Sequence, residues 1–107
     1  MEKSLPVIDP HSDDETSCAS RLKVLADETR LAVMELLLDG PQHVGELNES
    51  LQIEQSLLSH HLKVLRDAGL VHSERDGKQV LYRLATGVGR SRKRRSIDLG
   101  CCHLSFD

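Results

Sequence analysis

The sequence has 107 residues, a formal net charge of −3 and only two aromatic residues, Tyr82 and Phe106. A chain of this length is one domain near the lower limit for a self-sufficient core, so we expect leucine and valine to form that core and a second copy to complete it as a homodimer. The sequence shows neither a membrane-spanning stretch nor a secretion signal, which argues against a membrane protein and predicts a soluble, cytoplasmic one.

Two helices are predicted after an N-terminal arm, residues 1–15, which is acidic, contains two prolines and should be flexible. Thr16 or Ser17 is suited to cap a first helix that continues to about Ala26. Residues 27–30 interrupt the apolar pattern and begin a second helix, which an Asp-Gly-Pro sequence then ends.

A short third helix is predicted over residues 44–51, followed by a turn at residues 52–54 and a fourth helix. In this fourth helix, leucines recur from Leu58 at i+4 and i+7 and form an apolar stripe. Gly69 is a good C-terminal cap, so the helix should lead directly into a strand.

Two strands are predicted after the fourth helix, because residues 70–75 and 79–84 alternate between apolar and polar side chains. Asp76-Gly77 between them is a strong signal for a two-residue hairpin turn. Three or four helices followed by a β-hairpin predict a mainly α-helical fold with a β-hairpin wing. This is a winged helix-turn-helix domain, and we assign it to residues 16–85.

The apolar pattern is lost after residue 85, and residues 86–107 are predicted to form a basic linker and a cysteine-containing C-terminal tail. Within them, Arg90-Ser-Arg-Lys-Arg-Arg95 is either a clamp on the DNA backbone or a solvated linker. Residues 96–107 are apolar enough to dock on the rest of the domain.

The outer face of the fourth helix carries short hydrogen-bonding side chains near its N-terminus and a cation further along. Taken alone it is equally typical of a solvated helix face, but it suits a DNA groove, where such groups meet base edges and phosphates. The charge distribution favours DNA. Residues 1–50 contain 4 basic and 11 acidic side chains, whereas residues 51–107 contain 10 basic and 6 acidic ones.

Four segments, in this order and at these spacings, resemble the ArsR/SmtB family of bacterial metal(loid)-responsive repressors. They are Leu25-Ala-Asp-Glu-Thr-Arg-Leu31, Val44-Gly-Glu-Leu47, Ser59-His-His-Leu-Lys-Val-Leu-Arg-Asp-Ala-Gly-Leu-Val71 and Gly77-Lys-Gln-Val-Leu-Tyr-Arg83. The resemblance covers roughly residues 16–85. It implies a homodimeric transcriptional repressor that binds a palindromic operator in double-stranded DNA and releases it when an inducer binds. It implies no permanently bound cofactor.

The resemblance also places the DNA-contacting positions on the fourth helix and the wing. They are Gln55, Ser56, Ser59, His60 and Lys63 on the helix, and Arg75 and Lys78 in the wing. The alternative for the wing charges is simple solubility of a hairpin tip. Glu54 departs from the family pattern, which often has a serine cap there, and glutamate caps poorly.

Two inducer sites known in the family are not expected in this chain. One is a cysteine pair in the third helix, whose positions hold His43 and Gly45 here. The other is a zinc site of carboxylates and histidines on a long C-terminal helix, a signature that residues 86–107 lack.

Three cysteines remain as a candidate inducer site: Cys18, Cys101 and Cys102. Three thiolates without a strong fourth ligand suit a pyramidal ion such as arsenite or antimonite, whereas zinc prefers four tetrahedral ligands. In the family the first helix helps to form the dimer interface, so a site that includes Cys18, within one chain or across two, would control dimer geometry.

Three alternatives stay open for these cysteines. The first is a dithiol redox or reactive-sulfur switch. The second is a zinc or cadmium site completed by His103 with His11 or Asp13. The third is an incidental cysteine pair.

We therefore expect a ligand-responsive transcriptional repressor. The alternative class is a winged-helix protein-interaction module, against which the polar helix face and the basic wing argue. The sequence has no nucleophile–base spacing, phosphate loop or paired-carboxylate signature, so we do not expect an enzyme.

Overall fold

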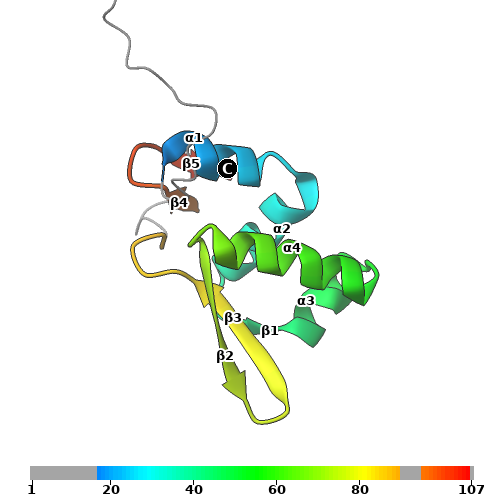
Figure 1. Cartoon of the computed structure of the whole chain (residues 1–107). Helices are drawn as coiled ribbons and strands as arrows, with labels where there is room; N and C mark the ends of the chain where they lie inside the picture. The colour runs from blue at the N-terminus through cyan, green and yellow to red at the C-terminus, as the bar shows by residue number, and fades with distance from the viewer. Residues whose placement is uncertain (1–16, 90–94, 107) are drawn as a thin grey trace, which may run out of the picture.

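The computed structural model describes residues 17–89 and 95–106 (Figure 1). The helices are α1 (Cys18–Leu25), α2 (Glu28–Leu37), α3 (Val44–Leu51) and α4 (Gln55–Asp67). The strands are β1 (Gln42–His43), β2 (Val71–Asp76), β3 (Gln79–Leu84), β4 (Ser96–Asp98) and β5 (His103–Ser105). The predicted N-terminal arm and residues 90–94 of the basic run lie outside the described residues.

The four predicted helices are confirmed, and side chains cap the first two. The Ser20 N–H donates to the Ser17 hydroxyl oxygen over 3.1 Å, which makes Ser17 the N-cap of α1. Asp27 caps α2 in the same way, since its carboxylate accepts from the Arg30 N–H over 3.0 Å. Glu54 precedes α4 without a side-chain cap.

The end of α4 is a Schellman motif built around Gly69. This glycine has a φ of +77°, a conformation that strains other residues. Its N–H donates to the Arg66 carbonyl over 2.9 Å, and the Leu70 N–H donates to the Leu65 carbonyl over 3.0 Å. The chain therefore turns sharply from α4 into β2.

The wing is the antiparallel β2–β3 hairpin, which projects away from the helices in Figure 1. Asp76 pairs with Gln79, so the turn consists of Gly77 and Lys78, one residue later than the predicted Asp76-Gly77 turn. Gly77 has a φ of +66° at the first turn position, where a type II′ turn requires glycine.

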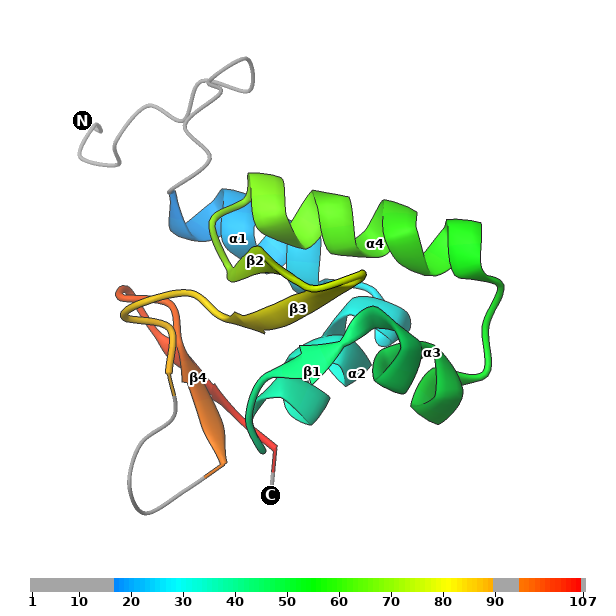
Figure 2. The ribbon, with the colours of Figure 1, turned by 90° about the horizontal axis from the view of Figure 1, so that it is seen from below.

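Strand β1 was not predicted, and it completes a three-stranded sheet in the order β1-β3-β2. Gln42 pairs with Tyr82 and His43 with Leu81, so the chain before α3 is attached directly to the wing, as Figure 2 also shows. A two-residue strand is too short to produce an alternating pattern, which is why the sequence did not reveal it.

The core consists mainly of leucine and valine side chains from the helices and the base of the wing, as predicted. The largest fully buried side chains are Val33, Met34, Leu47, Leu58, Leu62, Leu65, Leu70, Val71 and Ile97. Burial of each such side chain contributes about 1.5–3 kcal/mol of transfer free energy. No helix in the described part of the chain is long and apolar enough to cross a membrane.

The C-terminal segment docks through a second hairpin, in which β4 pairs antiparallel with β5. Ile97 is fully buried and Leu99 is only 3% exposed, so both belong to the main core. Arg95 anchors the start of the hairpin on α2 and its C-terminal end, through an ion pair of 2.5 Å with Asp39 and a longer one of 3.9 Å with Glu35. The turn of this hairpin lies beside α1, far from the tip of the wing (Figure 1).

Candidate nucleic-acid interface and cysteine cluster

The N-terminal half of α4 exposes the polar side chains that were predicted to read bases. They are Gln55, Ser56, Ser59 and His60. The first turn of the helix contains no acidic residue, so its positive dipole end is not neutralised from within the helix. The opposite face of α4 is buried in the core, which fixes the polar face outward.

A cleft of about 460 Å³ separates α4 from the wing. Gln55 and Ser59 line it from the helix, and Lys78 lines it from the wing turn. The fold thus brings together three predicted site residues from two elements. Gly45 and Gln79 also line this cleft, although neither was predicted to contact DNA.

The remaining predicted contacts are not among the residues that line this cleft. Arg75 is exposed on β2 and forms no ion pair with the described residues. The Lys63 ammonium group bonds the exposed Asp67 carboxylate over 2.6 Å, one helical turn along α4. Such exposed pairs are worth little, so a phosphate can replace Asp67. The Ser56 hydroxyl donates to the Glu54 carboxylate over 2.8 Å.

His61 is a polar residue on the buried face of α4. It is 7% exposed, and its Nδ1 accepts a hydrogen bond of 3.1 Å from Nε of Arg30 on α2. Arg30 also donates to the Val24 carbonyl at the end of α1 over 3.1 Å. One guanidinium group therefore joins α1, α2 and α4.

His43, at the junction of β1 and α3, connects the helices to the wing. Its Nε2 lies 2.7 Å from the Asp76 carboxylate and its Nδ1 lies 3.2 Å from the Glu46 carboxylate. The hydrogen bond to Asp76 is the main reason that the pKa of His43 is raised above its ordinary value. A protonated His43 is therefore favoured between these two carboxylates.

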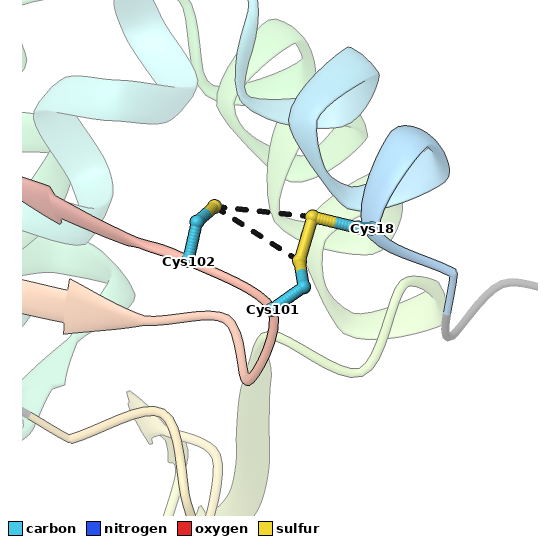
Figure 3. A group of neighbouring side chains, drawn as sticks. All are labelled: Cys18, Cys101 and Cys102. Carbon is cyan, nitrogen blue, oxygen red and sulfur yellow. Dashed lines mark hydrogen bonds between the residues drawn. A yellow bond between two sulfur atoms is a disulfide. The ribbon is translucent and has the colours of Figure 1, made fainter.

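The three cysteines meet within one chain, although α1 and the β4–β5 turn are far apart in sequence (Figure 3). Cys18 and Cys101 form a disulfide. Cys102 is free, with its Sγ 3.8 Å from Sγ of Cys18 and 3.9 Å from Sγ of Cys101. Cys101 is exposed, whereas Cys18 and Cys102 are half-buried.

This arrangement allows two kinds of chemistry. As a disulfide with a neighbouring thiol, the cluster supports thiol–disulfide exchange. In the reduced form, three thiolates whose sulfur atoms lie within 4.8 Å of one another offer a trigonal site for a soft ion. Among the described residues, no histidine or carboxylate joins this group as a fourth ligand. His103 is not part of it, and His11 and Asp13 lie outside the described residues.

Comparison with known proteins agrees with the architecture. The family model of the bacterial regulatory protein, arsR family, matches residues 27–73. A biofilm growth-associated repressor from Agrobacterium fabrum is 47% identical over 70 residues, which are 65% of this chain and 60% of that protein.

Two solved structures extend the similarity to the fold. HlyU from Vibrio cholerae N16961 has a TM-score of 0.63 and 38% identity, over 71% of this chain and 84% of that one. A homodimeric winged helix-turn-helix DNA-binding domain from Mycobacterium bovis has a TM-score of 0.58 and 27% identity, over 73% of this chain and 76% of that one.

The Agrobacterium fabrum relative is a repressor, HlyU from Vibrio cholerae is a transcriptional activator, and the Mycobacterium bovis domain is a DNA-binding domain. The chain spans about half the length of the curated relatives it matches. The matched family model runs from the cap of α2 through α4 into β2, and the similarity to HlyU covers most of that structure. The chain is a winged helix-turn-helix protein and belongs to the arsR family of bacterial regulatory proteins.

Proposed function

We propose that this protein is a DNA-binding transcriptional repressor, located in the cytoplasm. The exposed polar half of α4 beside the wing cleft is the observation that carries the proposal. Gln55 and His60 can donate to and accept from base edges, while Ser56 and Ser59 reach bases or phosphates. Lys78 in the cleft, with the exposed Lys63 on α4 and Arg75 on β2, supplies positive charge for the phosphate backbone.

The proposed active form is a homodimer on a palindromic operator. A two-fold dimer presents two copies of α4, and the symmetry of the operator should match that of the protein. Leu22 on α1 supports this proposal, because its side chain is large, apolar and 40% exposed in the single chain. The similar domain from Mycobacterium bovis is homodimeric.

Binding of a palindromic operator fragment, measured by fluorescence anisotropy at several salt concentrations, tests this function. Gln55→Ala and His60→Ala should each weaken specific binding roughly 10-fold, because a good base contact is worth about 1–3 kcal/mol. Glu28→Gln, at the exposed start of α2, is the matched control and should leave the affinity unchanged. Equal affinity of the wild-type protein for the operator and for random DNA would contradict the proposal.

The proposed inducer is arsenite, or the similar antimonite, bound by Cys18, Cys101 and Cys102. Three thiols and one As(OH)₃ give one trithiolate complex and three water molecules, with no change of oxidation state. The three sulfur atoms are close enough for this, and the described residues add no fourth ligand of the kind that zinc or cadmium needs. The Cys18–Cys101 disulfide must first be reduced by two molecules of a cytosolic thiol, which leave as their own disulfide.

A thiol redox or reactive-sulfur sensor is the second candidate, and the Cys18–Cys101 disulfide favours it. With a hydroperoxide as the two-electron oxidant, one cysteine becomes a sulfenic acid and an alcohol or water leaves. The second thiol then displaces water from the sulfenic acid and forms the disulfide. This chemistry needs Cys18 and Cys101 but not Cys102.

The different role of Cys102 separates the two candidates. Operator release by arsenite, added to the reduced protein, should be lost in Cys102→Ser, whereas release by the thiol oxidant diamide should remain. Full arsenite response of the Cys101→Ser, Cys102→Ser double variant would eliminate the metalloid site. Zinc, cadmium, peroxide and persulfide are tested for operator release in the same way.

A further inference from the structure

Arg21 lies on α1 one turn after Cys18, on the same side of the helix. Its Nη1 donates to the Leu99 carbonyl over 3.3 Å. Leu99 closes the turn that carries the cysteine pair, because its N–H donates to the Cys102 carbonyl over 2.8 Å. Arg21 therefore holds the segment that contains Cys101 and Cys102.

The other side of the Arg21 guanidinium group meets the end of α4. A β-carbon placed on Gly69 would lie only 3.6 Å from Nη2 of Arg21. Gly69 is the left-handed residue of the motif that ends α4, where the last carbonyl groups carry partial negative charge. One side chain thus bonds the cysteine turn and lies beside the residue that caps the helix bearing the proposed base-reading residues.

The hydrogen bonding of Arg21 is also incomplete. Its Nε is buried and has no partner among the described residues. A buried N–H without a partner is unfavourable, so this arrangement leaves the guanidinium group with an unused donor next to the carbonyl-rich end of α4. A shift of the cysteine turn can therefore change which carbonyl groups the N–H groups of Arg21 bond.

We propose that Arg21 is a positioning residue that couples the state of the cysteine cluster to the orientation of α4. With Cys101 bonded to Cys18, the turn is fixed to α1 and Arg21 is held by the Leu99 carbonyl. When the turn is released, Arg21 exchanges this bond for one to the end of α4 and seats the helix for operator binding. This inference rests on the proposed function.

The test measures the operator dissociation constant of each variant, once with reduced protein and once after oxidation with diamide. Diamide accepts two electrons and two protons from a pair of thiols and becomes the corresponding hydrazine. The ratio of the oxidised to the reduced constant expresses the coupling. For the wild-type protein we expect a ratio of about 10 or more, within the usual range of allosteric coupling.

Arg21→Met keeps the apolar stem of the side chain and removes the guanidinium group. We expect its ratio to fall to within about 2-fold of unity, because the reduced variant lacks the bond that seats α4 and its dissociation constant rises toward that of the oxidised protein. Lys23→Gln removes an exposed cation from the same helix and should keep the wild-type ratio. A folded Arg21→Met variant with an unchanged ratio overturns the inference.

Arg21→Lys decides the question if Arg21→Met does not fold. It keeps the charge but not the two-sided fork, so a ratio lowered by about 3-fold or more supports the coupling role and an unchanged ratio overturns it. Failure of the wild-type protein to bind the operator in either state contradicts the proposed function itself, and the coupling role with it. A ratio near unity in Arg21→Met, measured while the wild-type protein still binds the operator, contradicts neither proposal and is distinct from that failure.

Discussion

At the scale of single residues, His43 shows how an ordinary-looking surface position becomes structural. Its ring bridges the wing through Asp76 and the first turn of α3 through Glu46. Because β1 holds the His43 backbone against β3, the ring needs little extra ordering to make both contacts. The orientation of the wing relative to α3 therefore depends on this bridge, and so does the shape of the cleft beside α4.

Replacement of His43 should change how stability depends on pH. The pKa of His43 is raised above 6.5 in the folded state, chiefly by the hydrogen bond to Asp76. The folded state thus binds the proton more tightly, and the resulting stabilisation is complete below pH 6.5 and disappears as pH rises through the raised pKa. Urea unfolding at pH 6 and pH 9 should show that His43→Gln is destabilised at the lower pH but much less at the higher one.

His72→Gln is the matched control for this measurement. His72 is exposed on β2, in the same hairpin, and forms no ion pair with the described residues. If wild-type protein and His43→Gln differed in stability by the same amount at both pH values, protonation of His43 would contribute nothing to the free energy of unfolding.

At the scale of elements, the sequence predicted those that have an apolar repeat sustained over several turns or a clear start signal. The spacing from Leu58 fixed α4, and Asp27 marked the start of α2. The wing turn was placed one residue too early, since Gly77 suits the second position of a type I′ turn as well as the first position of a type II′ turn. Backbone pairing across the hairpin, which no local pattern encodes, selects between them.

The C-terminal hairpin could not be predicted because its strands have three residues each and pair only with one another. What holds it in place is non-local: Ile97 enters the core that the helices form, and Arg95 binds acidic residues of α2 and its end. The sequence indicated only that residues 96–107 were apolar enough to dock.

Ile97→Ala should therefore detach this hairpin. Loss of a fully buried isoleucine side chain costs about 2–5 kcal/mol, which urea unfolding would measure. Disulfide formation between Cys18 and Cys101 should also become slower, because the turn is no longer held beside α1. Leu104→Ala, at the paired but only partly buried position of β5, should have a smaller effect. Wild-type stability of Ile97→Ala would mean that the hairpin does not share the core.

At the scale of the whole molecule, residue chemistry predicted the members of the cysteine cluster but not their geometry. Cys18 and Cys101 are 83 residues apart in sequence, and only the docking of β4 and β5 beside α1 brings them together. That step depends on the full tertiary fold, so the sequence left open whether one chain or two would build the site. The described chain builds it alone, at the end of the molecule opposite the tip of the wing.

The long loop closed by the disulfide leads to a prediction about global stability. A cross-link over 83 residues removes much of the freedom of the unfolded chain, and such cross-links typically stabilise by about 2–4 kcal/mol. The oxidised wild-type protein should therefore need more urea to unfold than the reduced one. Cys18→Ser should abolish this difference, because Cys101 and Cys102 are adjacent and close no comparable loop.

Cys102→Ser is the control and should retain the difference, since it keeps both disulfide partners and removes only the neighbouring thiol. If Cys102→Ser instead lost the stabilisation, Cys102 would be the partner of Cys18 in solution, and the metalloid and redox candidates would have to be tested again with Cys101→Ser as the separating variant.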